Sequence, residues 1–145
     1  MICHIVIRPK SSQRVIAEAY EKKLYAYILG FSNNKHCRLY RIGGMPDHVH
    51  ILIEMAPDIC VSDFVKDLKT STNAFMRKNK DMFPLFEGWA SEYFAASCSP
   101  SDVEGVRQYI IGQKEHHKSV SFIDELKQVM RECGVDFEEN FLNKW

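Results

Sequence analysis

The run from Met45 to Ile53 constrains the fold more than any other stretch of this sequence. It reads Met-Pro-Asp-His-Val-His-Ile-Leu-Ile, with two histidines around one valine at the start of an apolar segment. Such a segment predicts a strand, in which His48 and His50 share one face while Val49 lies on the other. Two imidazoles on a stiff backbone can hold one divalent cation, or they can be ordinary polar residues on the solvent side of a sheet.

A second informative segment spans residues 103–117. Tyr109 and Gln113 are four residues apart and would be neighbours on a helix, with His116 continuing the same edge. This pair suits either catalysis or the structural pairing of a buried tyrosine with a hydrogen-bond partner. The helix itself is predicted by an apolar stripe at helical spacing, formed by Val103, Val106 and Ile110.

Together, His-x-His on a strand and Tyr-x-x-x-Gln on a later helix resemble the HUH endonucleases. The likeness is strongest to their small single-tyrosine transposases from insertion sequences and to the REP-associated relatives of these transposases. It covers nearly the whole chain. Besides the two motifs and the Met-Pro-Asp lead-in, it includes the opening Cys3–Lys10, Leu68–Ser71 on a middle helix, the late strand Trp89–Ser97 and the ending Gln113–His117.

The resemblance implies a role for each motif residue. Tyr109 would attack the scissile phosphate of single-stranded DNA and form a 5′-phosphotyrosine link. Mg²⁺ or Mn²⁺ would be held by His48, His50 and Gln113. The family also implies strand transfer without ATP, a DNA hairpin near the cleavage site and a homodimer, in which either subunit could supply the tyrosine.

The charge balance bears on the DNA partner. The chain has 19 basic residues (Lys and Arg together) and 19 acidic residues (Asp and Glu together), so its formal net charge is zero. We therefore do not expect strong non-specific binding to nucleic acid. A local basic cluster nevertheless occupies residues 66–80, and it is either a DNA contact or a solvated helix face. Given the resemblance, we expect DNA contacts from Lys66, Lys69, Arg77 and Lys78. His116 could also contact DNA, and it could instead support a metal ligand or be solvated.

The predicted order of elements is strand, helix, strand, strand, helix, strand and further helices. It indicates an α+β, ferredoxin-like (RRM-like) antiparallel sheet, with helices on one face, the histidines on the other, and C-terminal helices that carry Tyr109. The first and third strands would lie in the middle of the sheet. A loop is expected at 33–35 and a hairpin turn at 43–46. The expected elements are 3–7, 11–30, 37–42, 48–54, 61–75, 89–97, 103–117 and 122–133.

Length and composition favour one cytoplasmic domain over residues 1–145, because no apolar run is long enough to cross a bilayer. The five scattered cysteines form no zinc or disulfide pattern. Two alternatives to a transposase stay open. One is a non-catalytic, RRM-like module that binds single-stranded nucleic acid through its sheet, and the other is a domesticated or replication-initiating HUH nuclease with the same site residues.

Overall fold

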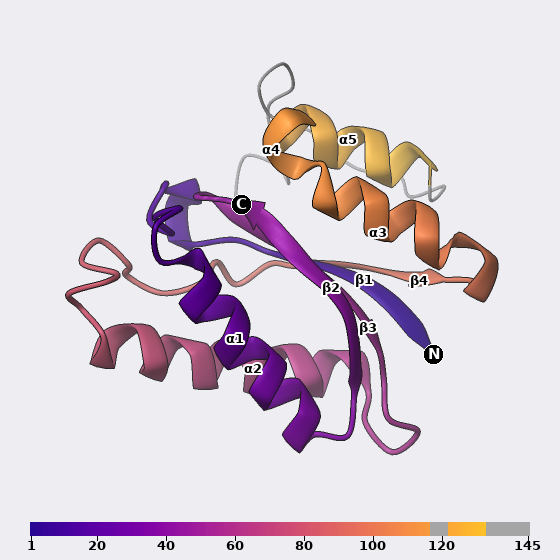
Figure 1. The fold of residues 1–145 in the computed structure, drawn as a ribbon, viewed down its shortest axis with the longest axis horizontal. Coiled ribbons are helices and arrows are strands. Elements are labelled where there is room, and N and C mark those ends of the chain that lie inside the picture. Colours follow the sequence, from indigo (N-terminus) through magenta and orange to yellow (C-terminus); the bar gives the residue numbers. More distant parts are fainter. Residues whose placement is uncertain (117–121, 133–145) are drawn as a thin grey trace.

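The structure is a computed structural model that describes residues 1–116 and 122–132 (Figure 1). In that part of the chain, no helix is both long and apolar enough to cross a membrane. The elements, in chain order, are β1 (Ile2–Ile7), the 3-10 helix η1 (Lys10–Ser12), α1 (Glu21–Asn34), β2 (Arg38–Met45), β3 (His48–Glu54), α2 (Val61–Lys78), β4 (Phe94–Cys98), the 3-10 helix η2 (Pro100–Asp102), α3 (Val103–Ile111), α4 (Gln113–His116) and α5 (Phe122–Glu132).

The four strands form one antiparallel sheet in the order β2-β3-β1-β4. This confirms that the first and third strands are central and that β2 lies at an edge. The strand predicted at 48–54 has those bounds in the structure. In the register of the sheet, Val6 of β1 lies opposite His50, and Gly43 of β2 lies on its other side.

The two faces of the sheet are covered by different helices (Figure 1). α1 and α2 pack on the face that carries Val49, Ile51 and Ile53, which form the core with side chains from both helices. Full burial of each such side chain contributes about 1.5–3 kcal/mol to stability. The other face is covered by α3, α4 and α5. His48 and His50 on that face are therefore buried, which excludes the interpretation that they are solvated sheet residues.

The N-terminal helix begins later than the sequence predicts. We expected it to start at Ser11, but Ser11 and Ser12 have φ angles of 60° and 58°, which a right-handed helix excludes. α1 starts at Glu21 instead and continues past Gly30 to Asn34, so the loop predicted at 33–35 is shorter.

Two other boundaries differ from expectation. Gly43, Gly44 and Met45 belong to β2, and the hairpin turn is confined to Pro46 and Asp47. The strand predicted from Trp89 begins only at Phe94, because Trp89 pairs with Pro9 in an isolated bridge before the chain enters the sheet. α5 confirms the predicted last helix to Glu132, whereas its expected end at Cys133 and Gly134 lies outside the described residues.

Candidate metal centre

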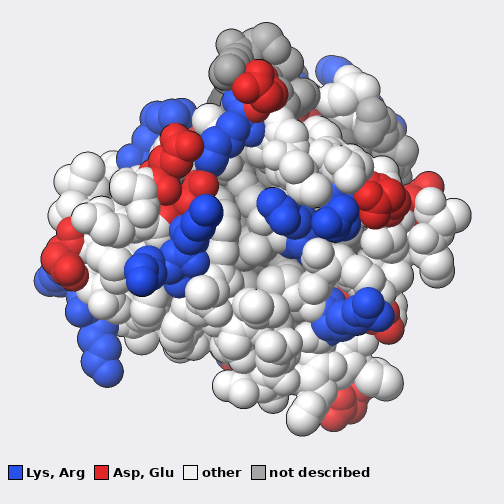
Figure 2. Space-filling model, viewed as in Figure 1, with Lys and Arg blue, Asp and Glu red and all other residues white. Residues whose placement is uncertain are grey.

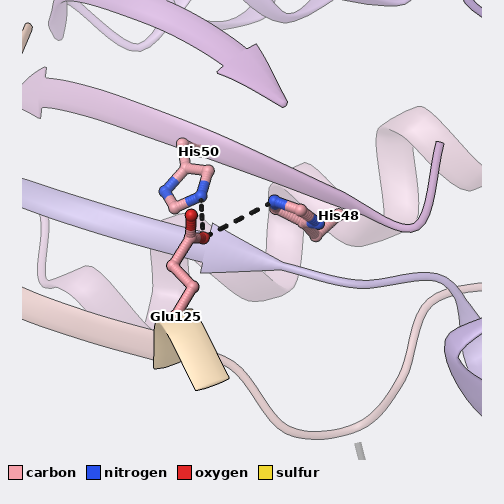
Figure 3. A group of neighbouring side chains, drawn as sticks. All are labelled: His48, His50 and Glu125. Carbon is pink, nitrogen blue, oxygen red and sulfur yellow. Dashed lines mark hydrogen bonds and ion pairs between the residues drawn. The ribbon is translucent and has the colours of Figure 1, made fainter. Parts of the chain in front are cut away.

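His48 and His50 present their Nε2 atoms to the same carboxylate. Both side chains come from β3, both are almost fully buried, and their ring centroids are 5.1 Å apart. Oε1 of Glu125 lies 2.9 Å from Nε2 of His50 and 3.6 Å from Nε2 of His48 (Figure 3). The alternation of the strand therefore places the two imidazoles on one face, as the sequence predicts.

Glu125 is a candidate ligand that the sequence reasoning missed. It projects from α5 towards the two histidines and is 2% exposed (Figure 3). The ligand atoms of His48, His50 and Glu125 all lie within 4.8 Å of one another. An acidic residue in the first turn of a helix is ordinary, because it complements the helix dipole. Its sequence position therefore gave no sign that the carboxylate is buried.

Gln113 joins this cluster from a different helix than expected. Its Oε1 atom lies 3.0 Å from Nε2 of His48, and its amide nitrogen donates to Oε2 of Glu125 at 3.0 Å. We predicted one continuous helix through Tyr109 and Gln113, but α3 ends at Ile111 and α4 begins at Gln113. Gly112 lies between them with φ −82° and ψ 7°, and its N–H still bonds the carbonyl oxygen of Gln108. The two side chains are thus placed by two helices.

Each histidine is also held at its other ring nitrogen. Oδ1 of Asp47 lies 2.7 Å from Nδ1 of His48, and Nε2 of His4 lies 2.8 Å from Nδ1 of His50. Burial opposes ionisation of Asp47, but the hydrogen bond from His48 and nearby positive charge hold the pKa of this carboxyl below its usual value. Burial, reinforced by His50, lowers the pKa of His4 to about 3, so His4 is a neutral imidazole at ordinary pH. Asp47 is thus both a turn residue and a partner of His48.

Tyr109 lies beside the cluster in the same chain. Its ring meets His50 edge to face, with centroids 5.7 Å apart, and it meets His4 in the same way at 6.4 Å. The side chain is half-buried. The structure therefore brings together all four residues that the sequence proposes for catalysis and metal binding, namely Tyr109, His48, His50 and Gln113.

Contacts with β2 hold the C-terminal helices against the sheet, and Gly43 allows the closest of them. A Cβ atom at Gly43 would lie 2.9 Å from Cγ2 of Ile110, so α3 packs directly against the strand backbone there. Lys114 of α4 donates to Oε2 of Glu21 at 2.9 Å and to the carbonyl oxygen of Gly44 at 3.1 Å. These contacts fix the position of Gln113, which precedes Lys114.

The predicted DNA contacts on α2 do not join this cluster. Lys66, Lys69, Arg77 and Lys78 all belong to α2, on the opposite side of the sheet from α3 to α5 (Figure 1). Lys69 donates to the carbonyl oxygens of residues 90, 91 and 92, at 2.8, 3.2 and 3.5 Å, and its burial lowers its pKa. The side chain of His116 lies outside the described part of the structure.

Three of these basic residues line an open groove of about 520 Å³ between α2 and the segment 88–93. They are Lys66, Lys69 and Arg77, and the groove also contains Trp89 and Tyr93. On the face in Figure 2, basic side chains lie in separate groups next to acidic ones instead of forming one stripe. This pattern agrees with the zero net charge.

Comparisons with known proteins bear on what this cluster does. Among solved structures, the chain is similar to a Deinococcus radiodurans R1 protein assigned as a transposase, with 24% identity and a TM-score of 0.61 over 78% of this chain and 90% of the other. It is also similar to a REP-associated tyrosine transposase bound to a REP hairpin, with 12% identity and a TM-score of 0.63 over 82% and 69% of the two chains. At these identities the likeness shows a shared fold.

No curated protein matches the chain. A family model described as "Transposase IS200 like" matches residues 1–113 of the 145. The match includes His48, His50, Tyr109 and Gln113 but ends before Glu125. The chain belongs to the family of IS200-like transposases.

Proposed function

We propose that this protein is an HUH-type DNA transposase that cleaves and rejoins single-stranded DNA through a 5′-phosphotyrosine on Tyr109. The observation that carries the proposal is the position of the Tyr109 ring, 5.7 Å from His50 and beside a cluster of nitrogen and oxygen donors. Membership of a transposase family supports the same reaction class. Nucleophile and charge-neutralising group must lie side by side for phosphodiester cleavage.

The donor set fits a hard divalent cation. His48 and His50 offer imidazole nitrogens, and Gln113 and Glu125 offer oxygens, a combination that suits Mg²⁺ or Mn²⁺. When His48 donates its Nδ1 proton to Asp47, the lone pair on Nε2 faces two oxygens at 3.0 and 3.6 Å. Such an arrangement is repulsive unless a proton or a cation lies among these atoms. When bound, the cation would neutralise charge on the phosphate that is attacked.

The reaction on Tyr109 balances without an energy cofactor. As Oη of Tyr109 forms a bond to the phosphorus, it loses its proton, and the bond from phosphorus to the 3′ oxygen breaks. That oxygen takes up a proton and leaves as a 3′-hydroxyl. A second DNA 3′-hydroxyl then attacks the phosphotyrosine, so a new phosphodiester forms and Tyr109 regains its proton. The energy of the first bond is conserved in the link to the enzyme.

Substrate and assembly form the rest of the proposal. We expect single-stranded DNA with a hairpin near the cleavage site, in keeping with a structural neighbour that is bound to a REP hairpin. We also propose a homodimer, since β2 is an edge strand that the same strand of a twofold partner could cover. A cytoplasmic location follows if the substrate is chromosomal DNA. A mobile-element role and a domesticated nuclease role use the same residues.

The sheet argues against a non-catalytic, RRM-like module. Such modules stack bases on an open sheet face. Here α3, α4 and α5 cover that face (Figure 1), and the buried residues on it include His4, His48 and His50. A single experiment separates the two functions: incubation with hairpin-bearing single-stranded DNA and Mn²⁺, followed by denaturing electrophoresis. A protein-DNA adduct that survives denaturation supports the transposase, and its absence with every strand tested would contradict it.

A further inference from the structure

His4 contacts the ring nitrogen of His50 that does not face Glu125. Nε2 of His4 is 2.8 Å from Nδ1 of His50, and the two rings stack with centroids 5.1 Å apart and planes inclined by 26°. In the β1–β3 register, Val6 lies opposite His50 and His4 lies opposite Leu52, so the two histidines are diagonal neighbours on one face. Central strands therefore fix this contact.

This hydrogen bond has two possible directions, because each neutral imidazole carries one proton. If Nε2 of His50 binds a cation, the His50 proton must be on Nδ1, and Nε2 of His4 must accept it. The proton of His4 is then on its own Nδ1. Without a cation, Nε2 of His50 donates to Glu125, 2.9 Å away. His50 then accepts at Nδ1, and His4 donates from Nε2.

His48 has a partner of a different kind. The Asp47 carboxylate accepts from Nδ1 of His48 at 2.7 Å, and an ionised carboxylate can only accept. The proton of His48 is therefore held on Nδ1 whether or not a cation is present. His50, by contrast, is paired with a group that both donates and accepts. His4 is 7% exposed, and its ring also meets Phe94 edge to face at 6.2 Å, which leaves it little freedom to turn.

We propose that His4 is a positioning residue of the metal centre, which holds the ring of His50 and reverses their shared hydrogen bond when a cation binds. The inference rests on the proposed function, because it requires His50 as a ligand. It assigns a role to a histidine outside the His-x-His and Tyr-x-x-x-Gln motifs. Outer partners of this kind typically change metal affinity by about 10–100-fold.

The first test uses the unaltered protein. Long-range ¹H–¹⁵N spectra of the histidine rings distinguish the two tautomers, and Zn²⁺ serves as a diamagnetic probe. We expect Zn²⁺ to move the proton of His4 from Nε2 to Nδ1, although His4 does not face the cation. An unchanged His4 tautomer, in a sample where His50 responds to Zn²⁺, would overturn the proposal. A purely structural packing role would not produce the switch.

The second test separates hydrogen bonding from packing. His4→Phe keeps a stacked ring but has no acceptor, whereas His4→Gln keeps an amide that can accept or donate. We expect calorimetry to show about 10–100-fold weaker Mn²⁺ binding for His4→Phe and a smaller loss for His4→Gln. His36→Gln is the control, since His36 is exposed near the start of β2, where Arg38 pairs with Glu54 at the end of β3 away from His48.

His48→Ala distinguishes failure of this inference from failure of the proposed function. If His48→Ala loses Mn²⁺ binding while His4→Phe binds as the wild type does, His4 has no positioning role and the metal centre stands. If His48→Ala binds Mn²⁺ normally, the metal centre is wrong and the role of His4 is rejected with it. If His4→Phe does not fold, His4→Gln and the spectra of the unaltered protein still decide the question.

Discussion

Tyr109 of α3 meets His50 of β3 edge to face, with ring planes inclined by 88°. The proposed nucleophile and a proposed metal ligand are thus neighbours within one chain, although the tyrosine and the histidine lie on separate elements. Replacing the phenol by a phenyl ring keeps this contact and removes only the hydroxyl oxygen.

We therefore expect Tyr109→Phe to abolish the covalent DNA adduct while leaving Mn²⁺ binding and single-stranded DNA binding largely intact. Denaturing electrophoresis measures the adduct, and calorimetry measures the metal affinity. His48→Ala and His50→Ala should show the complementary result, with both adduct and Mn²⁺ binding lost. Adduct formed by Tyr109→Phe at the wild-type level would reject Tyr109 as the nucleophile.

Glu125→Gln tests the carboxylate that α5 contributes. The substitution keeps the size of the side chain but removes its negative charge, so we expect Mn²⁺ affinity to fall at least about tenfold. Asp124→Asn is the matched control, because Asp124 is an exposed acid next to Glu125 on the same helix. Calorimetry of both variants is the measurement. Equal affinities in the two variants would remove Glu125 from the ligand set.

Gly44→Ala tests the close approach of β2 and β3. A Cβ atom at Gly44 would lie 2.3 Å from the carbonyl oxygen of His48, so the backbone must shift. We expect the free energy of unfolding to fall by about 1–3 kcal/mol, and Mn²⁺ binding to weaken. Gly30→Ala in α1 is the control, because a Cβ atom at Gly30 would have no neighbour within 4 Å. We expect this substitution to raise the free energy of unfolding by about 0.5–1 kcal/mol. Urea denaturation compares them, and equal stabilities would contradict the expected clash.

The lysines of α2 should separate into two functional groups. Lys69→Met removes an ammonium that donates to several carbonyl oxygens, so we expect a loss of about 1–3 kcal/mol in unfolding free energy. Lys66→Ala should leave stability unchanged and weaken single-stranded DNA binding. It should also reduce the slope of log affinity against log salt concentration by about one. Fluorescence anisotropy over a salt series checks this. Unaltered DNA binding would make Lys66 part of a solvated helix face.

Mixing variants tests how the subunits share the site. Because Tyr109 lies beside His50 of its own chain, heterodimers of Tyr109→Phe and His48→Ala/His50→Ala subunits should not recover cleavage. Cleavage restored in verified heterodimers would place each tyrosine in the partner's site. Sedimentation equilibrium tests the dimer itself, and a monomeric mass at high concentration would reject it.

The local signals in the sequence predicted the sheet well. Alternation through His48 to Glu54 gave both the strand and the common face of the histidines, because a strand has a strict period of two. Local signals failed where the backbone departs from its regular form. Ser11 and Ser12 adopt positive φ angles, which cannot be predicted from serine as a residue type. Gly112 ends a helix that the spacing of apolar residues predicted to be continuous.

Only the candidate site residues that belong to the two sequence motifs were predicted. Tyr109 and Gln113 were identified from their spacing and from resemblance. Glu125 and His4 were missed, because each becomes a partner of His50 only when a distant element packs beside β3. A carboxylate in a first turn and a histidine in a first strand are common, so no local pattern distinguishes them from ordinary residues.

The origin of Glu125 on α5 would link metal binding at the proposed centre to the docking of this helix. His48 and His50 belong to the sheet, so a cation shared with Glu125 would connect the last described helix to the central strands. A ligand that binds only the assembled form stabilises that form by mass action. A divalent ion bound there would therefore strengthen the docking of α5 on the sheet.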